Sequence, residues 1–108
     1  MKSPAYNEAM DYALEVLKAI KESGYEQDFP LEQFLNASMR IGACLAMCET
    51  SVDHEEMSEA YDEANINANR SIYWAEILGR IEDYEKIPFD SLRKKCENLQ
   101  VKIHDECK

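Results

Sequence analysis

Apolar residues recur at intervals of three and four along four segments of the chain, a spacing that places them on one side of an α-helix. These segments cover about residues 4–23, 28–48, 53–81 and 88–106. In the first helix we expect these residues to face inward: Tyr6, Ala9, Met10, Ala13, Val16, Leu17 and Ile20. In the second helix they are Phe34, Ala37, Ile41, Cys44, Leu45 and Cys48. In the fourth helix they are Phe89, Leu92, Cys96, Leu99 and Ile103. No segment alternates apolar and polar residues for long enough to predict a strand.

Helix boundaries coincide with residues that commonly start or stop helices. Gly24 follows the first periodic segment, and Pro30 lies in the first turn of the second. Asp53 followed by Glu56 resembles a capping box, and Pro88 opens the fourth segment. Short turns favour antiparallel neighbours. We therefore predict an all-α protein, in which residues 1–108 form one domain with an up-down antiparallel four-helix bundle.

The third segment carries more apolar residues than one buried face requires. Its expected inner face comprises Met57, Ala60, Tyr61, Ala64, Ala68, Ser71, Trp74, Ala75, Leu78 and Ile81. Four further apolar residues lie off this face, and we expect them to contact another subunit: Ile66, Ile72, Tyr73 and Ile77. A wide core face of a long central helix is the alternative. Trp74 is expected to anchor the core, and Tyr73 to lie nearer a subunit boundary.

Small residues in the middle of the second segment indicate a close helix contact. Gly42 lies inside this helix, where glycine costs about 1 kcal/mol relative to alanine, so a steric reason for it is expected. We expect the Gly42, Ala43 and Ala46 side to pack against the alanines of the third helix, Ala60, Ala64 and Ala68.

The charge distribution limits the classes of partner. A net charge of −10 repels nucleic-acid phosphates. The main basic cluster comprises Arg93, Lys94, Lys95 and Lys102, and these are the phosphate contacts we expect if nucleic acid binds; a simply solvated face is the alternative. The chain shows neither an apolar run that spans a bilayer nor an export signal, so we expect a cytoplasmic protein without membrane contact.

Residues that could carry catalysis or hold a metal are not grouped by any known spacing. His54 and His104 lack the preceding glutamate of a Glu-x-x-His di-iron motif. Cys44 and Cys48 are one turn apart, but two thiolates do not complete a zinc site. In the expected compartment the cysteines remain free thiols. We therefore expect no metal, no cofactor and no enzymatic activity.

Three stretches resemble a known family. RIGACLAMCE is similar to the SIGANI-x-EA segment of the bacterial four-helix-bundle proteins named after the 23S rRNA intervening sequence, and EANINANRSIYWAEILGRIEDYE is similar to their ALKEA-x-ET-x-YWLELL helix. FDSLRKKCENL fits the start of their last helix. The matching residues are Ile41, Gly42, Ala43, Ala68, Tyr73, Trp74, Glu76 and Leu78. The chain departs from the family at Asn36, where the family has arginine, at Cys44 for asparagine and at Met47 for glutamate.

The resemblance implies a bundle that assembles as a ring-like homo-oligomer, a pentamer, without enzymatic activity. The resemblance extends to proteins encoded within rRNA intervening sequences and, more distantly, to accessory proteins of diversity-generating retroelements, which bind a reverse transcriptase and nucleic acid; these relatives suggest contact with RNA or DNA. We therefore expect a non-enzymatic homo-oligomeric scaffold or adaptor for a protein partner. The alternative is a nucleic-acid-associated protein of the rRNA or reverse-transcriptase accessory type, which the acidic charge disfavours.

Overall fold

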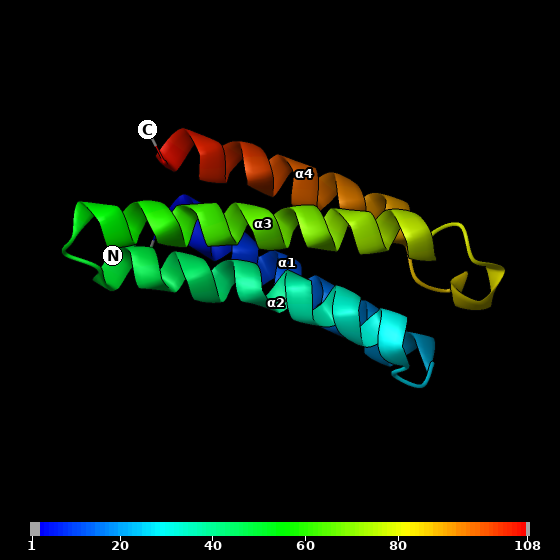
Figure 1. Ribbon diagram of the computed structural model, residues 1–108. Helices are drawn as coiled ribbons and strands as arrows, with labels where there is room; N and C mark the ends of the chain where they lie inside the picture. The colour runs from blue at the N-terminus through cyan, green and yellow to red at the C-terminus, as the bar shows by residue number, and fades with distance from the viewer. Residues whose placement is uncertain (1–2, 108) are drawn as a thin grey trace.

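Four α-helices joined by short connections make up the computed structural model of the protein, which describes residues 3–107 (Figure 1). The helices are α1 (Pro4–Ser23), α2 (Phe29–Thr50), α3 (His54–Leu78) and α4 (Phe89–Glu106), and a short 3₁₀ helix, η1 (Glu82–Tyr84), lies in the last connection. The described residues contain no strand. The predicted all-α four-helix bundle is confirmed.

Side-chain caps fix where three helices begin. The Ser3 hydroxyl accepts a hydrogen bond from the Tyr6 amide at 3.1 Å. The Asp28 carboxylate accepts one from Leu31 at 3.2 Å, and the Asp53 carboxylate accepts one from the Glu55 amide at 3.0 Å. Each cap satisfies an amide that the first turn of a helix leaves without a backbone partner. These caps explain why the helix starts follow the boundaries read from the sequence.

Glycines end the first and third helices in different ways. Gly24 follows α1 with a φ of 75°, the left-handed conformation that glycine adopts without strain. Gly79 ends α3 at Leu78, three residues before the predicted end at Ile81. A Cβ atom at Gly79 would lie 3.0 Å from the Ala75 carbonyl oxygen, because the chain tightens there into i→i−3 hydrogen bonds.

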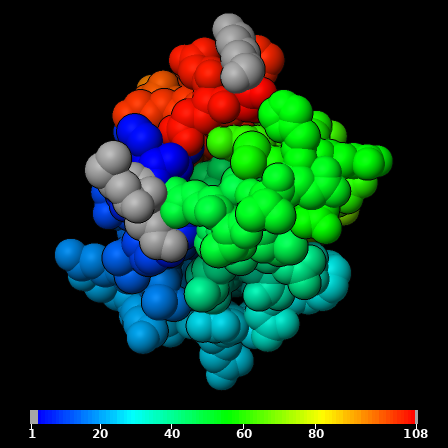
Figure 2. Space-filling model, turned by 90° about the vertical axis from the view of Figure 1, so that its left-hand side faces the viewer, coloured from blue at the N-terminus to red at the C-terminus, as the bar shows by residue number. Residues whose placement is uncertain are grey.

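Helices that follow one another in the sequence lie side by side, and α4 closes the bundle by packing against α1. The turn from α1 to α2 and the connection from α3 to α4 lie at one end, whereas the α2–α3 turn and both termini lie at the other (Figure 1). Seen from the end with the termini, α4 (red) lies opposite α2, with α1 and α3 to its sides (Figure 2). The bundle therefore has four lateral faces, one between each pair of neighbouring helices.

One hydrophobic core runs the length of the bundle. It contains all five inward positions expected in α4 and four of the six expected in α2; Ala37 is buried outside this cluster, and Cys44 is half-buried beside it. It also contains Tyr12, which the spacing did not single out. Tyr12 is 2% exposed, and its hydroxyl bonds with that of Ser71 at 2.6 Å; Ser71 bonds with Ser38 at 2.8 Å. Ser38 in turn donates to the Phe34 carbonyl at 2.7 Å. A hydroxyl chain thus links α1, α2 and α3 inside the core.

The predicted packing of Gly42 against the third helix is wrong. A Cβ atom at Gly42 would lie 3.6 Å from the Ala9 Cβ, so Gly42 faces α1. Ala43 and Ala46 line the same side. The three-four spacing shows that α2 has a narrow side, but two helices flank α2 and the spacing cannot distinguish between them.

Candidate functional site

The four basic residues expected to contact phosphates all lie on α4, and each already has a carboxylate partner. The Arg93 guanidinium pairs with Asp90 at 2.7 Å and with Glu97 at 2.8 Å. Lys94 pairs with Asp90 at 3.4 Å. On the face between α1 and α4, Lys95 pairs with Glu15 of α1, and Lys102 pairs with Glu8.

These ion pairs hold the four basic side chains on more than one face of the protein. Lys95 and Lys102 lean toward α1, whereas Arg93 lines a hollow on the side of α3. On that side Gln100 donates to the amide oxygens of Asn65 at 3.1 Å and Asn69 at 2.6 Å. The two faces that border α4 are therefore hydrophilic, and the structure does not gather the four cations into one positive patch.

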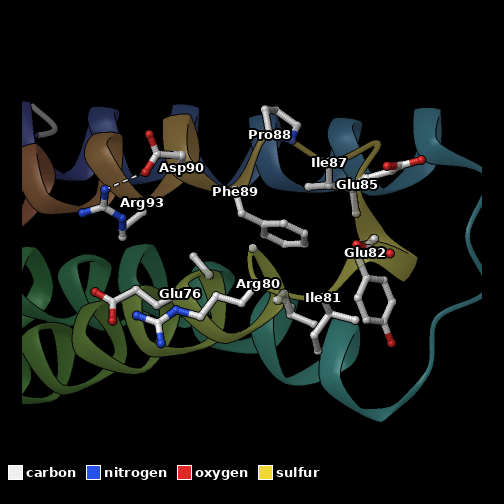
Figure 3. Close-up of a pocket in the computed structure, with 14 residues that line it drawn as sticks. Glu76, Arg80, Ile81, Glu82, Glu85, Ile87, Pro88, Phe89, Asp90 and Arg93 are labelled. Atoms are coloured by element: carbon white, nitrogen blue, oxygen red, sulfur yellow. Dashed lines mark hydrogen bonds and ion pairs between the residues drawn. The ribbon is translucent and has the colours of Figure 1, made fainter.

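A hollow that we call the loop hollow lies where the α3–α4 connection leaves the bundle (Figure 3). Its volume is about 680 Å³. Phe89, Ile87 and Leu78 form its apolar part and are almost fully buried. Charged residues border it: Glu76 and Arg80 from the α3 side, Glu82 and Glu85 from the connection, and Asp90 and Arg93 from α4.

The lining of the loop hollow offers ion pairs and apolar contact but neither a cysteine nor a histidine. Tyr84 is its one phenol, and the hydrogen bond that its hydroxyl donates to Asp28 raises the Tyr84 pKa to about 12. A phenol that holds its proton this firmly is not a general base near neutral pH. Arg93 lowers the pKa of the Asp90 carboxyl, so this group stays ionised.

Aromatic side chains gather on the face between α2 and α3. The ring of Phe29, at the start of α2, meets Trp74 of α3 edge to face at 6.1 Å, and Tyr73 meets Trp74 at 5.6 Å. Ile66 and Ile77 lie seven residues before and four residues after Tyr73, on the same side of α3. We call these five residues the aromatic surface; Phe29, Ile66 and Tyr73 are exposed.

Three of the four residues expected at a subunit interface therefore share one face. Ile66 and Tyr73 are exposed and Ile77 is half-buried. Ile72 is half-buried and packs against the bundle's own core.

The prediction that Trp74 anchors the core is wrong. Trp74 is half-buried at the margin of the core, because Ser71 and Ala75 occupy the inward positions on this part of α3. Tyr73 is exposed, and its position near a subunit boundary stays a prediction.

A second apolar surface, which we call the α1/α2 groove, lies on the neighbouring face. It has a volume of about 210 Å³, and no charged residue is among those that line it. The lining residues are Tyr6, Ala9, Met10, Ala13, Leu14, Leu17, Met39, Gly42, Ala43 and Ala46. Small residues leave a hollow, and the exposed side chains of Met10, Leu14 and Met39 stand beside it.

Sequence reasoning missed this groove because it assigned Met10, Ala13 and Leu17 to the core. The core is narrower than expected at α1, since Ala5, Ala9 and Tyr12 fill the inward positions. The missed signal was a second apolar stripe, Met10, Leu14 and Leu17, displaced around the helix from the buried one.

The cysteines do not form a metal centre. All four are free thiols: Cys48 and Cys96 are buried, Cys44 is half-buried and Cys107 is exposed. Over residues 3–107, no group of three or more histidine, cysteine or acidic side chains is placed to hold a metal ion. Within the same residues, no helix is long and apolar enough to cross a membrane.

Comparison with known proteins identifies a shared fold. No family model matches the chain, and no curated protein matches it. A crystal structure from Bacteroides thetaiotaomicron, of a protein with unknown function from the S23 ribosomal protein family, superposes with a TM-score of 0.84. The two sequences are 18% identical, over 96% of this chain and 98% of the other. At this identity the likeness shows the four-helix fold alone.

Proposed function

We propose that this protein is a non-catalytic, homo-oligomeric scaffold or adaptor that works through its lateral faces. The observation that carries the proposal is the uneven division of these faces. The two that meet at α2 expose large apolar side chains, including Leu14 and Tyr73, whereas the two that meet at α4 carry ion pairs and amide contacts. Exposed apolar surface of this kind marks protein contacts.

The arrangement of the two apolar faces supports closure into a ring. In a four-helix bundle neighbouring faces are turned by roughly 90°, and contacts between two different faces generate a closed ring when that rotation closes. An angle near this value fits roughly four or five copies. Such a ring would place α2 toward its centre and α4 outside. The family resemblance, which implies five copies, agrees with this range.

The outer faces are suited to holding a protein partner. On α4, which such a ring would place outside, Lys94 and Asp90 present exposed charges of both signs. Charges of both signs outside the ring would give a partner orientation and a faster encounter.

Light scattering coupled to size exclusion tests the oligomeric part of the proposal. We expect a mass that is a multiple of 12.5 kDa at micromolar concentration. Five copies would agree with the family resemblance, and four would still fit the ring. A single particle of 12.5 kDa at that concentration would overturn the proposal.

Nucleic-acid binding is the second candidate function, favoured by the family name of the structural relative. Arg93, Lys94, Lys95 and Lys102 would have to exchange their carboxylate partners for phosphates, so we expect weak affinity. Fluorescence polarisation with a structured RNA and a single-stranded DNA at ~50 mM salt tests it. Binding that survives at ~200 mM salt would favour this function over the scaffold.

A further inference from the structure

We infer that the α1/α2 groove is the socket for the aromatic surface of a neighbouring copy of this chain. The inference rests on the proposed assembly and specifies its interface. Both surfaces border α2. In a closed ring, the aromatic surface of each copy would therefore contact the groove of one neighbour, and its own groove would receive the aromatic surface of the other neighbour. This is a head-to-tail contact, the type that builds rings.

The shapes of the two surfaces are complementary. Between Met10 and Leu14 of α1 and Met39 of α2, the groove is lined by small residues, including Gly42 and Ala43. The absence of larger side chains there leaves room for a projecting group. Methionine walls can adjust to the shape of such a group, because the methionine side chain is unbranched and flexible.

The aromatic surface supplies the projecting groups. Phe29 and Tyr73 are exposed and lean edge to face on Trp74, which packs against the core. Contact with Trp74 already restricts both rings, so they lose little side-chain freedom on binding. Large aromatic residues that fill a pocket carry much of the energy of protein interfaces.

Charge also favours contact between these two faces. Heptad spacing places Lys21 on the groove side of α1 with Leu14, and Glu32 on the groove side of α2 with Met39, so this face carries charges of both signs. Arg70 lies between Ile66 and Tyr73 on the aromatic surface and forms no ion pair with any described residue. The same spacing places Glu59 and Glu63 on this side of α3, so the aromatic surface has charges of both signs. Glu32 forms no ion pair with a described residue either, and Arg70 of another copy can meet its carboxylate.

Two single variants used together test the inference. Leu14→Glu places a charge in the groove at a residue that is 56% exposed, and Tyr73→Glu places one on the aromatic surface at a residue that is 58% exposed. We expect each variant alone to be a monomer of 12.5 kDa by light scattering, because every contact in its ring includes one damaged surface.

An equimolar mixture of the two variants should form a complex of two chains. The intact groove of the Tyr73→Glu copy accepts the intact aromatic surface of the Leu14→Glu copy, and the remaining groove and aromatic surface are both damaged. Assembly therefore stops at one contact. Val101→Glu is the matched control, because Val101 is 60% exposed on α4; it should assemble like the unaltered protein. Circular dichroism and thermal melting establish that all three variants are folded.

Each other result has a distinct meaning. A mixture that stays monomeric overturns the inference, and so does either variant that assembles alone as the unaltered protein does. Assembly of Tyr73→Glu alone would indicate that two grooves pair with each other. Assembly of each variant alone would show that the groove does not hold the aromatic surface of another copy and is available to a different protein. A monomeric unaltered protein overturns the proposed scaffold itself.

Discussion

The buried hydroxyls of Tyr12, Ser38 and Ser71 are the main polar groups at the centre of the core. Ser71 bonds with both of the others, so its removal leaves the Tyr12 hydroxyl without its partner. We expect Ser71→Ala to lower the free energy of unfolding by about 1–3 kcal/mol. Urea denaturation measures this loss. Ser58→Ala, at an exposed position of the same helix, is the control and should change stability little; equal losses would contradict the role of the hydroxyl chain.

The Cys96 thiol makes stability sensitive to alkaline pH. Burial raises its pKa to about 11 from an ordinary 9.0, so the unfolded chain loses this proton at lower pH than the folded protein. Stability from Cys96 is therefore present below pH 9.0 and is lost as pH rises toward about 11, by about 2–3 kcal/mol in total.

Denaturation at a series of pH values with Cys96→Ala checks this sign. The variant should lose less stability than the unaltered protein between about pH 8 and about pH 11. Cys107→Ala is the control, because Cys107 is exposed and its removal should leave the pH dependence unchanged. A Cys96→Ala protein with the full alkaline loss would show that other groups, such as Tyr12, account for it.

At the scale of the helices, Gly42 and Gly24 should respond oppositely to alanine. Gly42 lies inside α2, and an added Cβ would make an ordinary contact with Ala9 at 3.6 Å. We expect Gly42→Ala to stabilise the protein by about 0.5–1 kcal/mol, because alanine favours the helix interior. Gly24→Ala should destabilise it by about 1 kcal/mol, because Gly24 has a φ of 75°. Melting temperatures should rise for Gly42→Ala and fall for Gly24→Ala. A lower melting temperature for Gly42→Ala would mean that α1 and α2 cannot make room for the added methyl group.

Helix positions were predictable because local groups determine them. Capping by Asp28 and Asp53 and the left-handed Gly24 act within a few residues, so the sequence displays them directly. The end of α3 was placed three residues too late, because Ile81 continues the apolar spacing although the chain already leaves the α-helix at Gly79 and makes i→i−3 hydrogen bonds there. Spacing also identified the narrow side of α2 without showing that α1, rather than α3, covers it.

At the scale of the whole molecule, the candidate surfaces were only partly predictable. Ile66, Tyr73 and Ile77 appeared as surplus apolar residues of one helix. The α1/α2 groove is built by two helices together, so neither stripe alone revealed it. The cations of α4 looked like a phosphate-binding patch because Glu8 and Glu15, which pair with two of them, lie some eighty or more residues away in sequence.

The net charge of −10 gives the assembly a characteristic response to salt. Copies that join mainly through apolar side chains must still overcome the repulsion between their acidic surfaces. Salt screens that repulsion, because the Debye length falls from about 10 Å at 0.1 M to about 3 Å at 1 M. We expect the dissociation constant of the oligomer to fall roughly three- to tenfold over this range. Sedimentation velocity at several protein concentrations measures it. Nucleic-acid binding would weaken under the same change, which separates the two functions. An oligomer that dissociates as salt is added would instead show that ion pairs, and not the groove and the aromatic surface, hold the copies together.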